Sequence, residues 1–269
     1  MKNLFIIPLF SLATVATSLG AAYATGFNTG YTNNQLAGQN TWKINDSSED
    51  LSFITILNGS IAGALGSYYN VPDAGSAGTT VFLYQDLGAA GTTVPYSDIE
   101  TSTASFSVDF AVIPSSNDYP SRDTFGFSFT GPGGATDLLT ILFQPNPTDS
   151  ELLDISWTTG GGSPTSTTKA VSYDGLYSLD VDFADGVGQG AGKGAFTATV
   201  GNYSFGGNLA SNSGEQIHLL GVRMIQDGAV PGDNFISFDN ISIVPEPSTG
   251  LLALSFLALT QFTRRRKLA

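Results

Sequence analysis

Residues 105–112 read Ser105-Phe106-Ser107-Val108-Asp109-Phe110-Ala111-Val112, and this stretch decides the fold class. Every second residue is phenylalanine or valine, whereas the residues between them are small or polar. A period of two residues is that of an extended strand with one face turned toward a core. The stretch therefore predicts a β-strand that is buried on one side only.

The same alternation recurs along the chain, and no stretch between residues 25 and 243 has the period of an amphipathic helix. Further strands are expected near 41–45, 51–57, 80–85, 124–130, 139–143, 153–157, 177–183, 195–200, 216–225 and 234–243. Glycine-rich breaks such as 131–134 and 160–164 fall between strands, which is typical of hairpin loops. Roughly a dozen short strands with one polar face each predict a single all-β domain, an antiparallel β-sandwich.

Composition excludes several classes of site before any motif is considered. The chain has 269 residues and a net charge of −13, which disfavours nucleic acid as a partner because phosphate binding needs a basic surface. It contains no cysteine, so disulfides and thiolate chemistry are excluded. It contains one histidine, His218, so a site that needs two imidazoles is excluded as well.

The N-terminal residues have the pattern of an export signal. Lys2 precedes the apolar run 4–19, and Ala22-Tyr23-Ala24 supplies a small-x-small site. This pattern predicts a secretory signal peptide over 1–24 that is cleaved after Ala24. An N-terminal membrane anchor is the alternative, and Pro8 and the scattered serines and threonines disfavour it.

The C-terminal residues 244–269 contain Pro245-Glu246-Pro247, an apolar segment over about 250–262, and the basic residues Arg264, Arg265 and Arg266. Together they resemble the PEP-CTERM sorting signal of Gram-negative bacteria. The resemblance implies export, transient anchoring in the inner membrane, and processing by an exosortase. Pro245, Glu246 and Pro247 would be the recognition motif, and the three arginines the membrane stop signal. The alternative is a C-terminal core helix, which would need no basic cluster.

These two ends divide the chain into a signal peptide (1–24), a β-sandwich ectodomain (25–243) and a sorting signal (244–269). The ectodomain contains five cations and 22 acids, a net charge of −17. Such a surface is soluble, repels anionic membranes and attracts cations. The expected final location is the cell surface or the extracellular matrix.

A second resemblance concerns the ectodomain. Gly30-Tyr31, Leu36-Ala37-Gly38-Gln39 and Trp42 resemble the opening of laminin-G-like domains, and the stretch 235–243 resembles their closing strand. Asp123-Thr124-Phe125-Gly126-Phe127 is compatible with a concanavalin A-like jelly roll. The resemblance implies the fold and not an activity, because such domains include sugar-binding proteins, enzymes and spacers.

Sugar recognition uses exposed aromatic rings with hydrogen-bonding groups beside them. Trp42, Tyr96, Tyr119 and Tyr173 lie near expected turns and are the candidate carbohydrate contacts. Each of the three tyrosines could instead be a half-covered residue at a strand end, because tyrosine is commonly of intermediate burial.

No cofactor is expected, with calcium as an open option. Asp185, Asp239 and Asn240 are the candidate oxygen ligands, although no stretch has the spacing of a calcium loop. The glycine-rich run 186–194 lacks the serine or threonine of a phosphate-binding loop after Lys193, so we expect a hairpin there.

No catalytic constellation is evident. Gly-x-Ser-x-Gly is absent, and so is the Glu-x-Asp-x-x-Glu strand typical of sandwich glucanases. We therefore expect an exported, non-catalytic surface or matrix protein, processed by an exosortase, with extracellular polysaccharide as a candidate ligand. A structural or adhesive matrix component without a ligand site is the first alternative, and a polysaccharide hydrolase is the second.

Overall fold

The structure is a computed structural model, and it describes eleven segments of the chain. These are 23–25, 42–44, 63–66, 80–87, 99–100, 104–114, 122–131, 137–185, 193–212, 216–225 and 235–245. The expected strand 51–57 lies outside them.

The described residues form sixteen β-strands. They are β1 (Tyr23–Thr25), β2 (Trp42–Ile44), β3 (Gly63–Gly66), β4 (Thr80–Asp86), β5 (Ile99–Glu100), β6 (Ala104–Ile113), β7 (Thr124–Thr130), β8 (Asp137–Pro145), β9 (Leu152–Thr158), β10 (Thr165–Ser172), β11 (Tyr177–Asp185), β12 (Lys193–Val200), β13 (Tyr203–Asn212), β14 (Gln216–Ile217), β15 (Leu219–Ile225) and β16 (Phe235–Pro245).

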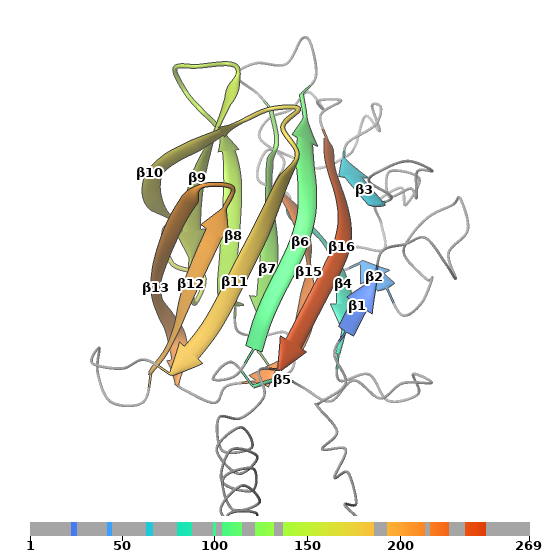
Figure 1. Cartoon of the computed structure of the whole chain (residues 1–269), viewed down its shortest axis with the longest axis vertical. Helices are drawn as coiled ribbons and strands as arrows, with labels where there is room; N and C mark the ends of the chain where they lie inside the picture. Colours follow the sequence, from blue (N-terminus) through green and yellow to red (C-terminus); the bar gives the residue numbers. More distant parts are fainter. Residues whose placement is uncertain are drawn as a thin grey trace, which may run out of the picture.

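Two large sheets lie face to face (Figure 1). The first has the order β1-β16-β6-β11-β12-β13, with β3 also paired to β16. The second has the order β10-β9-β8-β7-β15-β4-β2, and β14 pairs with β5 in a small separate sheet. Every pairing among the described strands is antiparallel. The expected antiparallel β-sandwich is confirmed.

The core lies between the two sheets and is rich in phenylalanine. The stretch that predicts the fold is β6, in which Phe106, Val108, Phe110 and Val112 are buried. Its rings reach across to the second sheet: the ring centroids of Phe110 and Phe143 are 4.5 Å apart. Aromatic pairs at such distances stabilise a core beyond the area that they bury.

The glycine-rich breaks connect neighbouring strands, as expected. The 160–164 break joins β9 to β10, and Gly160 and Gly161 have φ angles of 63° and 69°. The 186–194 run joins β11 to β12, with Asp185 in register with Gly194. β11 and β12 therefore form an antiparallel pair, and residues 186–192 between them lie outside the described residues.

Five of the described strands were not expected from the sequence: the short strands β1, β3 and β5, and the longer strands β10 and β13. β10 reads Thr-Ser-Thr-Thr-Lys-Ala-Val-Ser, and β13 contains a pair of glycines. Both are edge strands, one in each sheet. An edge strand near the rim of a core needs fewer apolar residues, so its sequence shows little alternation. The expected strand 216–225 is also divided, since His218 separates β14 from β15.

The two ends of the described chain both lie at β16. Ala24, the expected cleavage position, pairs in β1 with Ser242, and Pro245 ends β16 opposite Ala104. Glu246, Pro247, the segment 250–262 and the three arginines lie outside the described residues. No helix among the described residues is long and apolar enough to cross a membrane.

Candidate functional site

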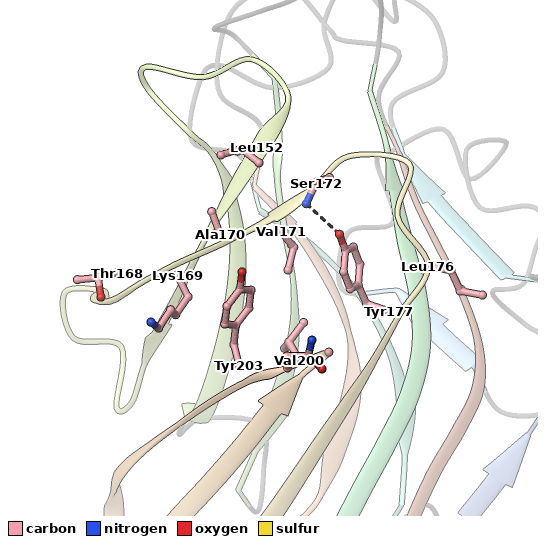
Figure 2. Close-up of a pocket in the computed structure, with 12 residues that line it drawn as sticks. Leu152, Thr168, Lys169, Ala170, Val171, Ser172, Leu176, Tyr177, Val200 and Tyr203 are labelled. Atoms are coloured by element: carbon pink, nitrogen blue, oxygen red, sulfur yellow. Dashed lines mark hydrogen bonds between the residues drawn. The ribbon is translucent and has the colours of Figure 1, made fainter.

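A groove opens at the side of the sandwich where the edge strand β10 of the second sheet faces the β12–β13 turn of the first (Figure 2). Its walls are residues 168–172 of β10, residues 200–203 of the turn, Leu176 and Tyr177 at the start of β11, and Leu152 of β9. Its volume is about 690 Å³, within the range of about 300–1,000 Å³ that is usual for small-molecule sites.

A β-bulge positions the charged wall of the groove. Ser166 is in register with Ser156 and Lys169 with Ile155, so β10 carries two extra residues, Thr167 and Thr168, at this point. The Thr167 hydroxyl donates to the Ile155 carbonyl oxygen at 2.7 Å, and the Lys169 N–H donates to the Thr167 hydroxyl at 3.2 Å. Thr168 has a φ angle of 59°, a strained conformation for a β-branched residue. Bulges commonly redirect a side chain near a functional site.

The opposite wall carries an exposed aromatic ring. Gly201, with a φ angle of 56°, forms the turn after β12, and Tyr203 begins β13 directly after it. Tyr203 is 38% exposed, one of the few large apolar side chains that the described surface presents. The Lys169 ammonium lies 5.7 Å from the centroid of the Tyr203 ring, so the two walls meet in a cation–π contact.

The inner end of the groove is apolar and rigid. Val171 and Val200 are buried beneath it. The Ser172 N–H donates to the Tyr177 hydroxyl at 3.0 Å, which fixes the Tyr177 ring between the two sheets (Figure 2). A Cβ atom at Gly175 would lie 2.5 Å from that ring, so a larger residue there would have to displace the Tyr177 side chain. The site is therefore preformed, with an apolar floor and polar groups at its mouth.

The residues that line the groove include no carboxylate and no imidazole. Glycoside hydrolysis needs a pair of carboxylates about 5–10 Å apart on either side of the bond that is cleaved. Among the described residues, those that line the groove do not supply such a pair.

Two of the four expected carbohydrate contacts belong to the core, which corrects the sequence-based expectation for them. Trp42 is 1% exposed, and its ring centroid lies 6.4 Å from that of Phe238. Tyr173 is 6% exposed and has the Arg122 guanidinium 4.6 Å from its ring centroid. A ring covered in this way has no free face for a sugar. Tyr96 and Tyr119 lie outside the described residues.

The three expected calcium ligands do not come together. Asp239 on β16 is opposite Asp109 on β6, which pairs with Ser178 on β11. Asp185 lies seven residues farther along β11, about 23 Å away at the rise of an extended strand. Asn240 donates from Nδ2 to the Asp109 carboxylate at 2.9 Å. No group of three or more candidate metal-binding side chains occurs among the described residues.

Sequence reasoning missed the two residues that define the groove, Lys169 and Tyr203. A signal for each exists. Lys169 is one of only five cations in residues 25–243, and Tyr203 directly follows a Gly-Asn turn. What the sequence does not show is that two edge strands from different sheets bring them together.

No family model matches the sequence, and no curated protein matches it either. Similar solved structures exist. The carbohydrate recognition domain of Emp47p superposes with a TM-score of 0.50 at 13% identity, over 84% of this chain and 95% of that one. The CBM2 module of the evolved Dit of Lactobacillus casei BL23 phage J-1 has a TM-score of 0.49 at 11% identity, over 84% and 96%. A β-1,3-1,4-glucanase (lichenase) from a mouse hindgut metagenome has a TM-score of 0.47 at 12% identity, over 83% and 99%. These likenesses concern the fold, an all-β sandwich of the jelly-roll type.

Proposed function

We propose that this chain is an exported, non-catalytic protein of the cell surface or extracellular matrix that binds carbohydrate in the groove between β10 and the β12–β13 turn. The observation that carries the proposal is the exposed Tyr203 ring at the mouth of a preformed groove of about 690 Å³. Its fold is shared with a carbohydrate recognition domain, that of Emp47p, which is consistent with this role.

The chemistry of the groove suits a sugar. A pyranose ring has an apolar face that packs against an aromatic ring and hydroxyl groups that need hydrogen-bond partners at the edge. Tyr203 supplies the ring, and Lys169 and Asn202 supply exposed polar groups beside it. Because Tyr177 is already held by the Ser172 N–H, little conformational entropy is lost at this side chain when a ligand binds.

The proposed export route also agrees with the end of the sandwich. β16 runs to Pro245, so the last core strand is complete where the Pro-Glu-Pro motif begins. Cleavage by an exosortase after this motif would release the sandwich with all of β16 in place. The inner membrane and an exosortase are therefore the transient partners in this proposal.

Carbohydrate binding is tested with the full chain on a panel of bacterial and algal polysaccharides, first with calcium and then with EDTA. We expect Tyr203→Ala to weaken binding about tenfold, or 1.4 kcal/mol, and Tyr203→Phe to preserve it, because the ring and not the hydroxyl makes the contact. Tyr84→Ala, on β4 away from the groove, is the matched control.

Each outcome has a distinct meaning. Binding that survives EDTA supports an aromatic platform, whereas binding that EDTA abolishes places the ligand at a metal. If no polysaccharide binds, or if binding depends on salt concentration and not on Tyr203, the protein is a structural matrix component and this proposal is wrong. Turnover of a labelled polysaccharide would contradict the non-catalytic assignment.

Sorting is tested by the double substitution Glu246→Ala and Pro247→Ala, which leaves Pro245 and its strand intact. We expect uncleaved protein to accumulate in the inner membrane. Glu215→Ala serves as the control for the loss of one carboxylate. Normal release of the double variant would refute the sorting proposal.

A further inference from the structure

The groove differs in charge from the rest of the chain. The sequence has 23 acids and 10 bases, yet the only charged side chain that lines the groove is a cation, Lys169. A concave site that is lined by one cation and by no acid attracts an anionic group on a ligand.

Lys169 also differs from the arginines of the described structure in what it contacts. Arg223 forms a two-pronged ion pair with Asp137, with N–O distances of 3.0 and 3.2 Å. Arg122 is buried and donates to the Ser150 carbonyl oxygen at 2.7 Å. Lys169 is exposed, and within the described residues its ammonium contacts the Tyr203 ring and no carboxylate. It therefore retains hydrogen-bond donors for a ligand.

The bulge places this cation at the groove. If the register set by Ser166 and Ser156 continued, Lys169 would lie opposite Leu153. The two extra residues move Lys169 to the position opposite Ile155, where it faces Tyr203. The positive φ angle of Thr168 shows that the chain adopts this shift at an energetic cost. A strained conformation that positions a side chain in a groove points to a role for that side chain.

We propose that the groove selects a hexuronate, a sugar whose carboxylate forms an ion pair with Lys169 while its ring packs against Tyr203. This inference rests on the proposed carbohydrate-binding function and names its ligand class. The ammonium lies only 5.7 Å from the Tyr203 ring centroid, so the anion and the packed ring must belong to one compact unit. A hexuronate meets this condition because its carboxylate is attached directly to the pyranose ring.

The net charge of the protein restricts the form of the ligand. A long polyanion would lie against the acidic surface around the groove and be repelled by it. A short oligosaccharide needs to contact only the residues of the groove and not the acidic surface around it. The appropriate probe is therefore trigalacturonate, and its neutral counterpart is the same trisaccharide with all carboxylates methyl-esterified.

Binding of both trisaccharides to the full chain is measured by calorimetry, with the thermal unfolding of each variant as a check of folding. We expect the wild type to bind trigalacturonate about tenfold more tightly than the methyl ester. Lys169→Gln should abolish this preference, whereas Lys169→Arg should retain it. Lys43→Gln, which removes an exposed lysine on β2, is the matched control and should leave the preference unchanged.

The outcomes separate this inference from the function on which it rests. Equal binding of the two trisaccharides, or a preference that persists in Lys169→Gln, overturns the hexuronate assignment. If neutral polysaccharides bind through Tyr203 and trigalacturonate does not, the assignment fails and carbohydrate binding stands. If the wild type binds no saccharide at all, both fail.

Discussion

Asp109 and Asp239 lie directly opposite each other on the paired strands β6 and β16. Asp239 is 5% exposed, and the Asn240 N–H donates to its carboxylate at 2.8 Å. Burial raises the pKa of the Asp239 carboxyl above its usual value. The Asn240 hydrogen bond lowers this pKa in part, and the nearby Asp109 carboxylate raises it. Burial, together with the neighbouring Asp109 carboxylate, therefore makes ionisation of Asp239 unfavourable in the folded protein.

A raised pKa in the folded state has a definite consequence for stability. The folded chain holds the proton of Asp239 more tightly than the unfolded chain does. The stabilisation that protonated Asp239 gives to the folded state is therefore fully present below the unfolded pKa of about 3.8. This stabilisation is lost as the pH rises from that value through the raised pKa of the folded state. We expect Asp239→Asn to stabilise the protein at neutral pH, because asparagine keeps the acceptor for the Asn240 N–H without a charge. Urea unfolding between pH 3.5 and 7 measures the effect.

The matched control for that experiment is Asp180→Asn, which removes an acid from the exposed face of β11. Its curve of unfolding free energy against pH should stay within about 0.5 kcal/mol of the wild-type curve, because substitutions at exposed positions change stability little. The Asp239→Asn curve should instead diverge from the wild type as the pH rises. Parallel curves for both variants would show that Asp239 ionises normally in the folded state.

The phenylalanine cluster between the sheets should dominate the stability of the sandwich. The Phe110 ring is fully buried, and its centroid lies 4.5 Å from that of Phe143 and 5.6 Å from that of Phe127. We expect Phe110→Ala to lower the free energy of unfolding by about 3–5 kcal/mol. Leu176→Ala, at a side chain that is 66% exposed, should change it by less than about 0.5 kcal/mol. Denaturant unfolding of the two variants tests the contrast.

The fold was predictable because strands such as β6 and β11 bury mainly one face, and such strands alternate in sequence. The stretch that begins at Ser105 alternates most clearly between apolar and polar residues. In the structure it lies in β6, where buried and half-buried residues alternate over most of the strand. β10 and β13 escaped prediction because an edge strand is covered on fewer sides, so selection for apolar residues is weaker there.

The candidate site was less predictable, for a different reason. An aromatic residue near a turn can point into the core or out of it, and the sequence does not distinguish the two cases for Trp42 and Tyr173. Lys169 and Tyr203 become neighbours only because the two sheets pack face to face. A contact between edge strands of different sheets leaves no periodic signal in the sequence.

Removing the backbone strain at Thr168, in the bulge before Lys169, should increase the stability of the protein. Thr168 has a φ angle of 59°, which costs a residue with a Cβ atom about 1–2 kcal/mol. Glycine adopts this conformation freely but loses more entropy on folding. We therefore expect Thr168→Gly to stabilise the protein by about 0.5–1 kcal/mol, measured by urea unfolding. Thr148→Gly, in an exposed turn without a positive φ angle, should give no gain.

A central glycine allows the second sheet to pack closely. Gly221 of β15 lies between Tyr84 of β4 and Ser128 of β7. A Cβ atom at Gly221 would contact the Leu83 carbonyl oxygen and lie 2.6 Å from the Tyr84 Cα atom, and backbone atoms cannot move aside as a side chain can. We expect Gly221→Ala to lower the free energy of unfolding by about 1–3 kcal/mol, since it overpacks two paired strands.

The control for Gly221→Ala is Gly162→Ala, in the exposed turn after β9, where the nearest atom would be the Thr159 carbonyl oxygen at 3.3 Å. This variant should change the free energy of unfolding by less than about 0.5 kcal/mol. Hydrogen exchange of the β4 and β15 amides should also become faster in Gly221→Ala alone, because the added methyl group separates those two strands. If Gly221→Ala is as stable as the control, β4 and β15 are not as close as the structure places them.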